Sequence, residues 1–479
     1  SEVISLLANS VPVEDIAAGL IQAVARRVGN MAKRLGVEPV LVFSGGVAKN
    51  KGVRKAMEEI IGYKFADLNF DPQLIGAYGA AVLACGDTKS IKVKKEQKTL
   101  QTNNKLNYLL QARPDEITSM RESGGKTLGY FCSYVPEEIV HAMGITPIRL
   151  IRGGNVEASN VGNTYLTQNS CPFAASCIGF KDGNYDFYFS SMDLIADAPS
   201  CYQMKRVLEV WEKYFNSKII HIGFPRNFYE ENGIKYFMET LFKFIEELEI
   251  ETKRKLNSLY LGESVLLYNS IRDKQRLLYQ HLKFNRINWS ELIPFIHAGF
   301  VLDKQMYLSL LNELIAEIEK RPKIDINLPL RILVTGGMMA PGDEKLIKIF
   351  NSLEMDFAMD ELCAGSRNIY RNIEAPNIEN IARAYLSNVP CGALPYPYPD
   401  SDPRLKHIEK LIKEYQINGI LYYTLRFCDA YSYKAKQIKE FCEKLNIPFL
   451  HLHSDFSTSD EGQLKTRVEA FKESILAMK

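Results

Sequence analysis

The stretch Gly419-Ile-Leu-Tyr-Tyr-Thr-Leu-Arg-Phe427 ends directly before Cys428 and sets the pattern from which the fold of this chain follows. It is a short, largely apolar run rich in aliphatic and aromatic residues, which is typical of a buried β-strand. Two further segments have the same character and are also followed by a cysteine: Lys126–Phe131 before Cys132, and Asp356–Leu362 before Cys363. Because strands in open α/β sheets point their carboxyl ends at the ligand crevice, the pattern suggests a ligand site assembled by the fold.

Strand-like runs alternate with helical ones in two parts of the chain, residues 106–226 and residues 326–479. In the first part we expect strands at Thr127–Phe131, Pro147–Ile151, Tyr185–Phe189 and Ile219–Ile222, and in the second at Ile332–Thr335, Ile420–Tyr423 and Pro448–His451. Residues 227–325 between them are mostly helical in their apolar period. This alternation predicts an α/β protein with two flavodoxin-like or Rossmann-like parallel-sheet domains joined by a helical region.

The first 88 residues form a further α/β unit in this reading. We expect a helix at Val13–Leu35, a strand at Pro39–Phe43 and a glycine turn at Ser44–Val47, where glycines let the backbone turn tightly. Residues 89–105 are polar and rich in lysine, and they show no apolar periodicity, so they are expected to form a linker.

The length and composition of the chain limit the number of its domains and the classes of partner that we expect. The 479 residues are enough for about three domains, and 59 Lys and Arg side chains are balanced by 57 Asp and Glu side chains. Without a basic excess, nucleic acid and anionic membrane are not expected partners. No run approaches the roughly 18 apolar residues of a membrane span, and no signal pattern precedes the first helix. We therefore expect a cytoplasmic protein.

The chain has nine cysteines, and in the reducing cytoplasm these are metal ligands or core residues rather than disulfide partners. Any single cysteine is more often a small buried hydrophobe than a ligand. Six of them follow strand-like segments or lie just beyond them: Cys132, Cys171, Cys201, Cys363, Cys391 and Cys428. Thiolates suit iron–sulfur clusters or zinc, but structural zinc sites usually show short paired spacings, which are absent here. The six together therefore favour an iron–sulfur site.

The motifs around these cysteines carry a family resemblance. They are Gly129-Tyr-Phe-Cys-Ser-Tyr-Val-Pro-Glu-Glu138, Cys171-Pro-Phe-Ala-Ala-Ser-Cys177, Leu362-Cys-Ala-Gly-Ser-Arg367, Val389-Pro-Cys-Gly392 and Leu425-Arg-Phe-Cys-Asp429. Through them the chain after the linker resembles the 2-hydroxyacyl-CoA dehydratase and benzoyl-CoA reductase subunit family. Phe43-Ser-Gly-Gly-Val-Ala-Lys-Asn50 and the segment from Asp71 to Ala81 resemble the carboxyl-terminal end of that family's activator ATPases. The resemblance implies a partial actin-like fragment that does not hydrolyse ATP by itself.

The resemblance also implies a ligand set. In the dehydratases three cysteines of a subunit hold one [4Fe–4S] cubane, and the matching residues here are Cys171, Cys201 and Cys428. The remaining three of the six, Cys132, Cys363 and Cys391, would then hold a second cubane, as in the double-cubane cluster proteins, which the chain resembles most. Three cysteines are left as core or surface thiols: Cys85, Cys177 and Cys442.

The function that the resemblance implies is that of an oxidoreductase. A separate ATP-hydrolysing activator, with its own [4Fe–4S] cluster, would pass low-potential electrons to the double-cubane cluster of a homodimer, which would reduce a small molecule. The alternative is a lyase, a 2-hydroxyacyl-CoA dehydratase subunit with one [4Fe–4S] cluster that acts on a CoA thioester through a ketyl radical. A third possibility is an inert scaffold or electron carrier that uses its activator-like segment only for docking.

Overall fold

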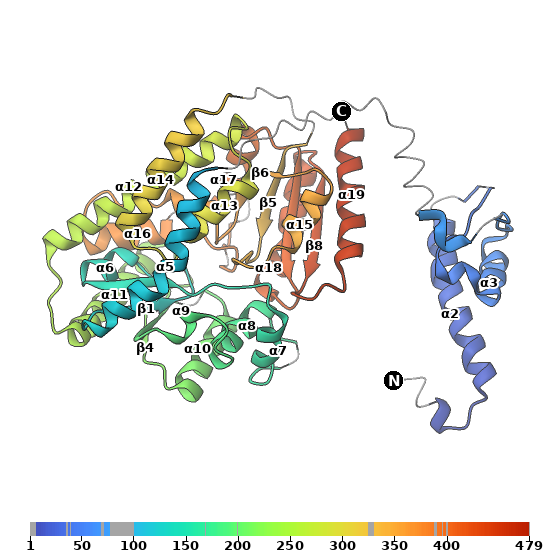
Figure 1. The fold of residues 1–479 in the computed structure, drawn as a ribbon, viewed down its shortest axis with the longest axis horizontal. Helices are drawn as coiled ribbons and strands as arrows, with labels where there is room; N and C mark the ends of the chain where they lie inside the picture. Colours follow the sequence, from blue (N-terminus) through green and yellow to red (C-terminus); the bar gives the residue numbers. More distant parts are fainter. Residues whose placement is uncertain are drawn as a thin grey trace. The chain divides into compact units, whose positions relative to one another are not determined.

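The computed structural model describes residues 6–34, 37, 38, 40–68, 71–76, 100–167, 169–198, 200–323, 330–387, 390–394, 396–398 and 401–478. The chain divides into two compact units, Ser1–Lys98 and Thr99–Lys479 (Figure 1). A linker is expected at residues 89–105, and its part up to residue 99 lies outside the described residues. Its last residues, from Thr102 onward, are the first turn of helix α5 (Thr102–Glu122).

The first unit contains two packed helices, α2 (Val13–Arg34) and α3 (Lys51–Ile61), and two short 3₁₀ helices, η1 (Gly46–Lys49) and η2 (Pro72–Leu74). The side chain of Asn50 caps α3 by accepting hydrogen bonds from the second and third residues of the helix. The strand expected at residues 39–43 is reduced, in the described part, to one parallel bridge between Leu41 and Phe65. Cys85 and residues 77–81 of the second activator-like motif lie outside the described residues.

The first sheet of the second unit contains four parallel strands, β1 (Lys126–Tyr130), β2 (Ile145–Arg149), β3 (Leu194–Asp197) and β4 (Ile219–His221), in the order β2-β1-β3-β4. This confirms the predicted parallel α/β architecture. One expected strand, Tyr185–Phe189, is wrong because the segment forms the short helix α9 (Phe187–Ser190). Asp186 caps that helix by accepting a hydrogen bond from the backbone of Tyr188 at 2.9 Å, and short apolar runs cannot be assigned by periodicity alone.

The second sheet repeats this topology. Its strands are β5 (Ile332–Gly336), β6 (Phe357–Glu361), β7 (Gly419–Leu425) and β8 (Phe449–Ser454), all parallel, in the order β6-β5-β7-β8. Every residue of β7 is buried, as expected for a strand that is covered by helices on both faces. In both sheets the crossovers change direction between the first and third strands. Ligands of doubly wound folds bind in the crevice outside the strand ends at this point.

Helices cover both sheets. The first sheet is flanked by α5, α6 (Glu137–Ala142), α7 (Val156–Gly162), α8 (Pro172–Asp182) and α10 (Tyr202–Phe215), and the predicted helical region contains α11 (Glu231–Thr252), α12 (Ser258–Lys283), α13 (Trp289–Ala298) and α14 (Lys304–Glu319). The second sheet is accompanied by α15 (Lys345–Ser352), η3 (Ser366–Tyr370), α16 (Ile378–Ser387), α17 (Pro403–Glu414), α18 (Asp429–Lys444) and α19 (Glu461–Ala477). Figure 1 shows α15 and α19 beside the second sheet. Within the described residues, no helix has the length and apolar character needed to cross a membrane.

The loops that follow β2 and β5 touch through their backbones. Gly154 has φ of +73°, and a Cβ atom added to it would lie 1.9 Å from the carbonyl oxygen of Gly342. Gly153 also donates a backbone hydrogen bond of 2.9 Å to Pro341. A glycine is therefore required at position 154 both by its conformation and by the space available. This contact brings loops at the carboxyl ends of the two sheets together.

Candidate functional site

A cavity of about 920 Å³ lies in the second unit, and all six cysteines predicted from the sequence line it: Cys132, Cys171, Cys201, Cys363, Cys391 and Cys428. Four of them follow strands β1, β3, β6 and β7, so both sheets contribute. Cys171 instead immediately precedes α8, and Cys391 lies between α16 and α17. Two other cysteines, Cys177 and Cys442, are fully buried elsewhere and do not line the cavity.

Three of the cavity cysteines share a structural position. Cys171, Cys201 and Cys428 are the N-cap residues of α8, α10 and α18. The partial positive charge at a helix N-terminus stabilises anionic groups, including thiolates. A hydrogen bond between Cys171 and Cys428 lowers the pKa of the first thiol and raises that of the second. Burial raises the pKa of Cys201 to about 12, and nearby Cys171 contributes to the rise. These three thiols are neighbours.

The other three cavity cysteines are neighbours too. The Sγ atom of Cys132 and that of Cys391 each lie 3.7 Å from the hydroxyl of Ser200. Burial raises the pKa of Cys132 to about 11, with further contributions from Cys391 and then Cys363. The Sγ atom of Cys363 lies 3.7 Å from the hydroxyl of Ser133, which directly follows Cys132. These two sets of three adjoin one another, since Cys391 and Cys132 also contribute to the raised pKa of Cys201.

Arg149 contacts one of the cavity cysteines and was not identified from the sequence. It is the last residue of β2 and is only 3% exposed. Its guanidinium donates to the Sγ atom of Cys363 at 2.9 Å and to the carbonyl oxygen of Cys363 at 3.0 Å. Burial acts to raise the pKa of Cys363, but Arg149 and then Arg367 outweigh it and lower the pKa to about 7. The site therefore supplies positive charge next to one thiolate.

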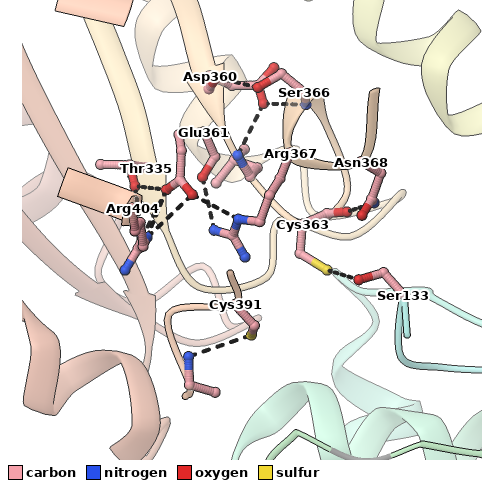
Figure 2. A network of polar contacts seen from close by, with 12 residues as sticks. Ser133, Thr335, Asp360, Glu361, Cys363, Ser366, Arg367, Asn368, Cys391 and Arg404 are labelled. Carbon is pink, nitrogen blue, oxygen red and sulfur yellow. Dashed lines mark hydrogen bonds and ion pairs between the residues drawn. The ribbon is translucent and has the colours of Figure 1, made fainter. Parts of the chain in front are cut away.

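A buried ionic network holds the loop that carries Cys363 (Figure 2). The carboxylate of Glu361 accepts from Nε of Arg367 at 2.7 Å and from Nη2 of Arg404 at 2.8 Å. The hydroxyl of Thr335 donates to the same carboxylate at 2.5 Å. The two guanidinium groups hold the pKa of Glu361 far below its usual range even though burial opposes this. Figure 2 shows the carboxylate of Glu361 between the side chains of Arg404 and Arg367, with Cys363 and Cys391 nearby.

The same network reaches the second cysteine in this region. Nη1 of Arg367 donates to the hydroxyl of Tyr431 at 2.8 Å, and that hydroxyl lies 3.3 Å from the Sγ atom of Cys391. The backbone N–H of Ala393 also donates to this sulfur at 3.4 Å. Cys391 is therefore surrounded by hydrogen-bond donors, and donors to thiolate sulfur are among the groups that tune cluster potentials.

The six cavity thiols can be compared with the ligand arrangements that a single metal ion and an iron–sulfur cluster need. Among the described residues, no three His, Cys, Asp or Glu side chains converge on a point where one metal ion could sit. A single zinc ion requires thiolates that all lie ~2.3 Å from one centre. In a cluster each thiolate binds a different iron, so the thiolates surround a volume. Six thiols around one cavity fit the second arrangement.

Comparisons with known proteins cover both units. A family described as 2-hydroxyglutaryl-CoA dehydratase, D-component, matches residues 132–475, and the BadF/BadG/BcrA/BcrD ATPase family matches residues 1–84. The putative dehydratase subunit YjiM of Escherichia coli (strain K12) is 24% identical over 74% of this chain and 93% of its own length. The (R)-phenyllactyl-CoA dehydratase beta subunit of Clostridium sporogenes is 25% identical over 74% of this chain and 93% of its own length.

The first unit has relatives of its own. The 2-hydroxyisocaproyl-CoA dehydratase activator of Clostridioides difficile is 42% identical over 100 residues, which are 21% of this chain and 36% of the activator. The chain therefore contains a segment similar to about a third of an activator, followed by a segment similar to nearly the whole of a dehydratase subunit.

Proposed function

Because this chain belongs to the family of the 2-hydroxyglutaryl-CoA dehydratase D-component, we propose that it is the iron–sulfur component of a reductase. It accepts low-potential electrons from an ATP-hydrolysing activator that carries its own [4Fe–4S] cluster, and it reduces a small molecule at a double-cubane cluster. A homodimer is the proposed working form. The observation that supports this proposal most is the convergence of six cysteines on one cavity.

The two groups of cysteines support two cubanes with three ligands each. The N-cap thiols Cys171, Cys201 and Cys428 would hold one cubane, and Cys132, Cys363 and Cys391 would hold the other. Iron–sulfur clusters supply single-electron chemistry at potentials that range over roughly −700 to +450 mV. The residues of the chain set where in this range the cluster operates, through burial, hydrogen bonds and charge.

The charges that this chain places around the cavity have a defined effect. Arg149 donates to Cys363, and three helix N-termini face the other group of thiols. Both features stabilise negative charge. They therefore favour the reduced, more negative state of whatever the thiols bind, and they allow electrons to be stored in a buried site.

The proposed partner is a complete activator ATPase. The similarity of residues 1–84 to the ATPase family extends over only about a third of the activator from C. difficile. A nucleotide-closing fold of the actin type needs both lobes, so this segment alone is proposed not to hydrolyse ATP. It would instead contribute to docking between the chain and its electron donor.

A second candidate is a 2-hydroxyacyl-CoA dehydratase subunit with a single [4Fe–4S] cluster. The names of the relatives favour it, since the protein from C. sporogenes is a dehydratase subunit. In that case the thiols Cys171, Cys201 and Cys428 would hold the cluster, a CoA thioester would react through a ketyl radical, and the other three cavity thiols would have no iron to bind.

Iron and acid-labile sulfide per chain decide between the two candidates. The protein is purified anaerobically as wild type, as the Cys132→Ala, Cys363→Ala, Cys391→Ala triple variant, and as Cys442→Ala, a buried cysteine outside the cavity. The proposal expects about eight irons in the wild type and in Cys442→Ala, and about four or fewer in the triple variant. About four irons in all three proteins would favour the dehydratase. A folded wild type that binds no iron would contradict both.

A further inference from the structure

A second cavity of about 500 Å³ lies in the second unit, and none of the cysteines that the structure describes lines it. It lies between the loops after β2 and β5, helix α9 and helix α13. Its walls are mainly apolar and aromatic, and include Ile151, Phe187, Phe189, Trp289, Ile293 and Leu362. Its volume falls in the range of ~300–1,000 Å³ that is usual for pockets that bind small molecules.

One polar side chain in this cavity has a buried atom without a hydrogen-bond partner among the described residues. His297, on α13, lines the cavity, and its Nε2 atom has no hydrogen-bond partner among the described residues. Burial lowers the pKa of His297 to about 3, with help from Arg149. The ring is therefore neutral, and one nitrogen of a neutral imidazole is an acceptor. A buried polar atom without a partner costs free energy, which a ligand could recover by forming a hydrogen bond with it.

The other charged groups that line the cavity already have partners. Arg152 forms an ion pair of 2.8 Å with Asp186. Arg149 is directed at Cys363. Asp343 accepts a hydrogen bond of 3.1 Å from the hydroxyl of Tyr423, and Glu344 forms an ion pair of 3.2 Å with Lys348. The cavity thus offers no uncompensated cation for an acidic ligand, and its composition favours an uncharged one.

A short chain of side-chain contacts runs from this cavity to the cysteine-lined cavity. The ring of Phe300 stacks on His297, with ring centroids 5.5 Å apart, and the guanidinium of Arg149 lies 5.0 Å from the centroid of the same ring. Arg149 in turn contacts the sulfur of Cys363 at 2.9 Å. A molecule against His297 and Phe300 would therefore lie two side chains from a cavity cysteine.

We propose that this cavity binds an uncharged molecule with an aromatic or branched aliphatic body and one hydroxyl or amide group, which forms a hydrogen bond with Nε2 of His297. The site is independent of the proposed cluster and of its chemistry. Trp289 lies in its wall, so an occupant changes the surroundings of one of the two tryptophans of the chain.

The test uses two probes of equal heavy-atom number, phenol and toluene, which differ by one hydroxyl for one methyl group. Binding is measured by calorimetry on the full chain, and tryptophan emission in a Trp211→Phe background reports on Trp289 alone. In the His297→Leu variant we expect the affinity for phenol to fall about tenfold while the affinity for toluene is unchanged or higher, since a lost hydrogen bond is typically worth about a factor of ten.

Two further variants complete the experiment. Ile347→Phe fills the cavity from α15 and should abolish the binding of both probes, which keeps the test decisive if His297→Leu does not fold. His281→Leu removes another buried histidine, whose ring nitrogens also lack partners among the described residues but which lies outside the cavity, and it should change neither affinity. Undetectable binding of both probes to the wild type, equal loss of phenol affinity in His281→Leu and His297→Leu, or full binding in Ile347→Phe would overturn the proposal.

Discussion

Replacing Glu361 by glutamine removes the carboxylate that lies between the guanidinium groups of Arg367 and Arg404. The side chains are 0%, 1% and 5% exposed, so water screens none of the three charges effectively. The hydroxyl of Thr335 donates to the same carboxylate. In Glu361→Gln two buried cations would face a neutral amide, and the amide nitrogen would point a donor at groups that are themselves donors.

The expected loss is large because one member of a buried ionic network is removed while the others stay. Removing one partner of a buried ion pair typically destabilises a protein by about 3–5 kcal/mol. A matched control is Glu409→Gln, which removes the carboxylate of the exposed pair between Glu409 and Lys413 on α17. Exposed helical pairs at this spacing contribute about 0.3–0.5 kcal/mol. The two variants make the same chemical change and differ in burial.

Urea unfolding monitored by tryptophan fluorescence measures both variants. Trp211 and Trp289 are buried in the second unit, so their emission reports on the unit that contains the network. We expect Glu361→Gln to lower the free energy of unfolding by about 3–5 kcal/mol. Iron content should fall with it, since Cys363 follows Glu361 by two residues. A loss of less than about 1 kcal/mol, the upper range for exposed pairs, would refute the argument that this network holds the loop.

Three further outcomes are expected from the same structure. Because its two cations depress the pKa of Glu361, its stabilisation is complete above the ordinary carboxyl pKa of about 4.3 and is lost as the pH falls. The stability gap between wild type and Glu361→Gln should therefore narrow in urea titrations below about pH 4.5. Gly154→Ala should lower the melting temperature, since it combines a positive φ with a backbone clash, whereas Gly462→Ala, with open space around it, should raise stability by about 0.5–1 kcal/mol. Trp289→Phe removes a 2.7 Å hydrogen bond to Asp360 and should cost about 1–3 kcal/mol by circular dichroism.

The strands that carry cysteines were predictable because their signal is local. The runs before Cys132, Cys363 and Cys428 are apolar, short and bounded, and they correspond to β1, β6 and β7. Strand β3 was not predicted, although the shorter strand β4 was. The segment at residues 185–189 was predicted to be a strand and is also short. It forms a helix instead, and the side chain of Asp186 caps that helix.

By itself the sequence determined the class of fold, because buried parallel strands and amphipathic helices each show a characteristic spacing of apolar residues along the chain. It also supplied the six thiols, although Cys171 and Cys391 do not follow strands directly. Only the tertiary structure placed the six around one cavity and directed Arg149 at Cys363, a residue 214 positions away. The physical reason is that such contacts depend on how two sheets pack and on which way each side chain leaves its strand end, and neither is recorded in local sequence.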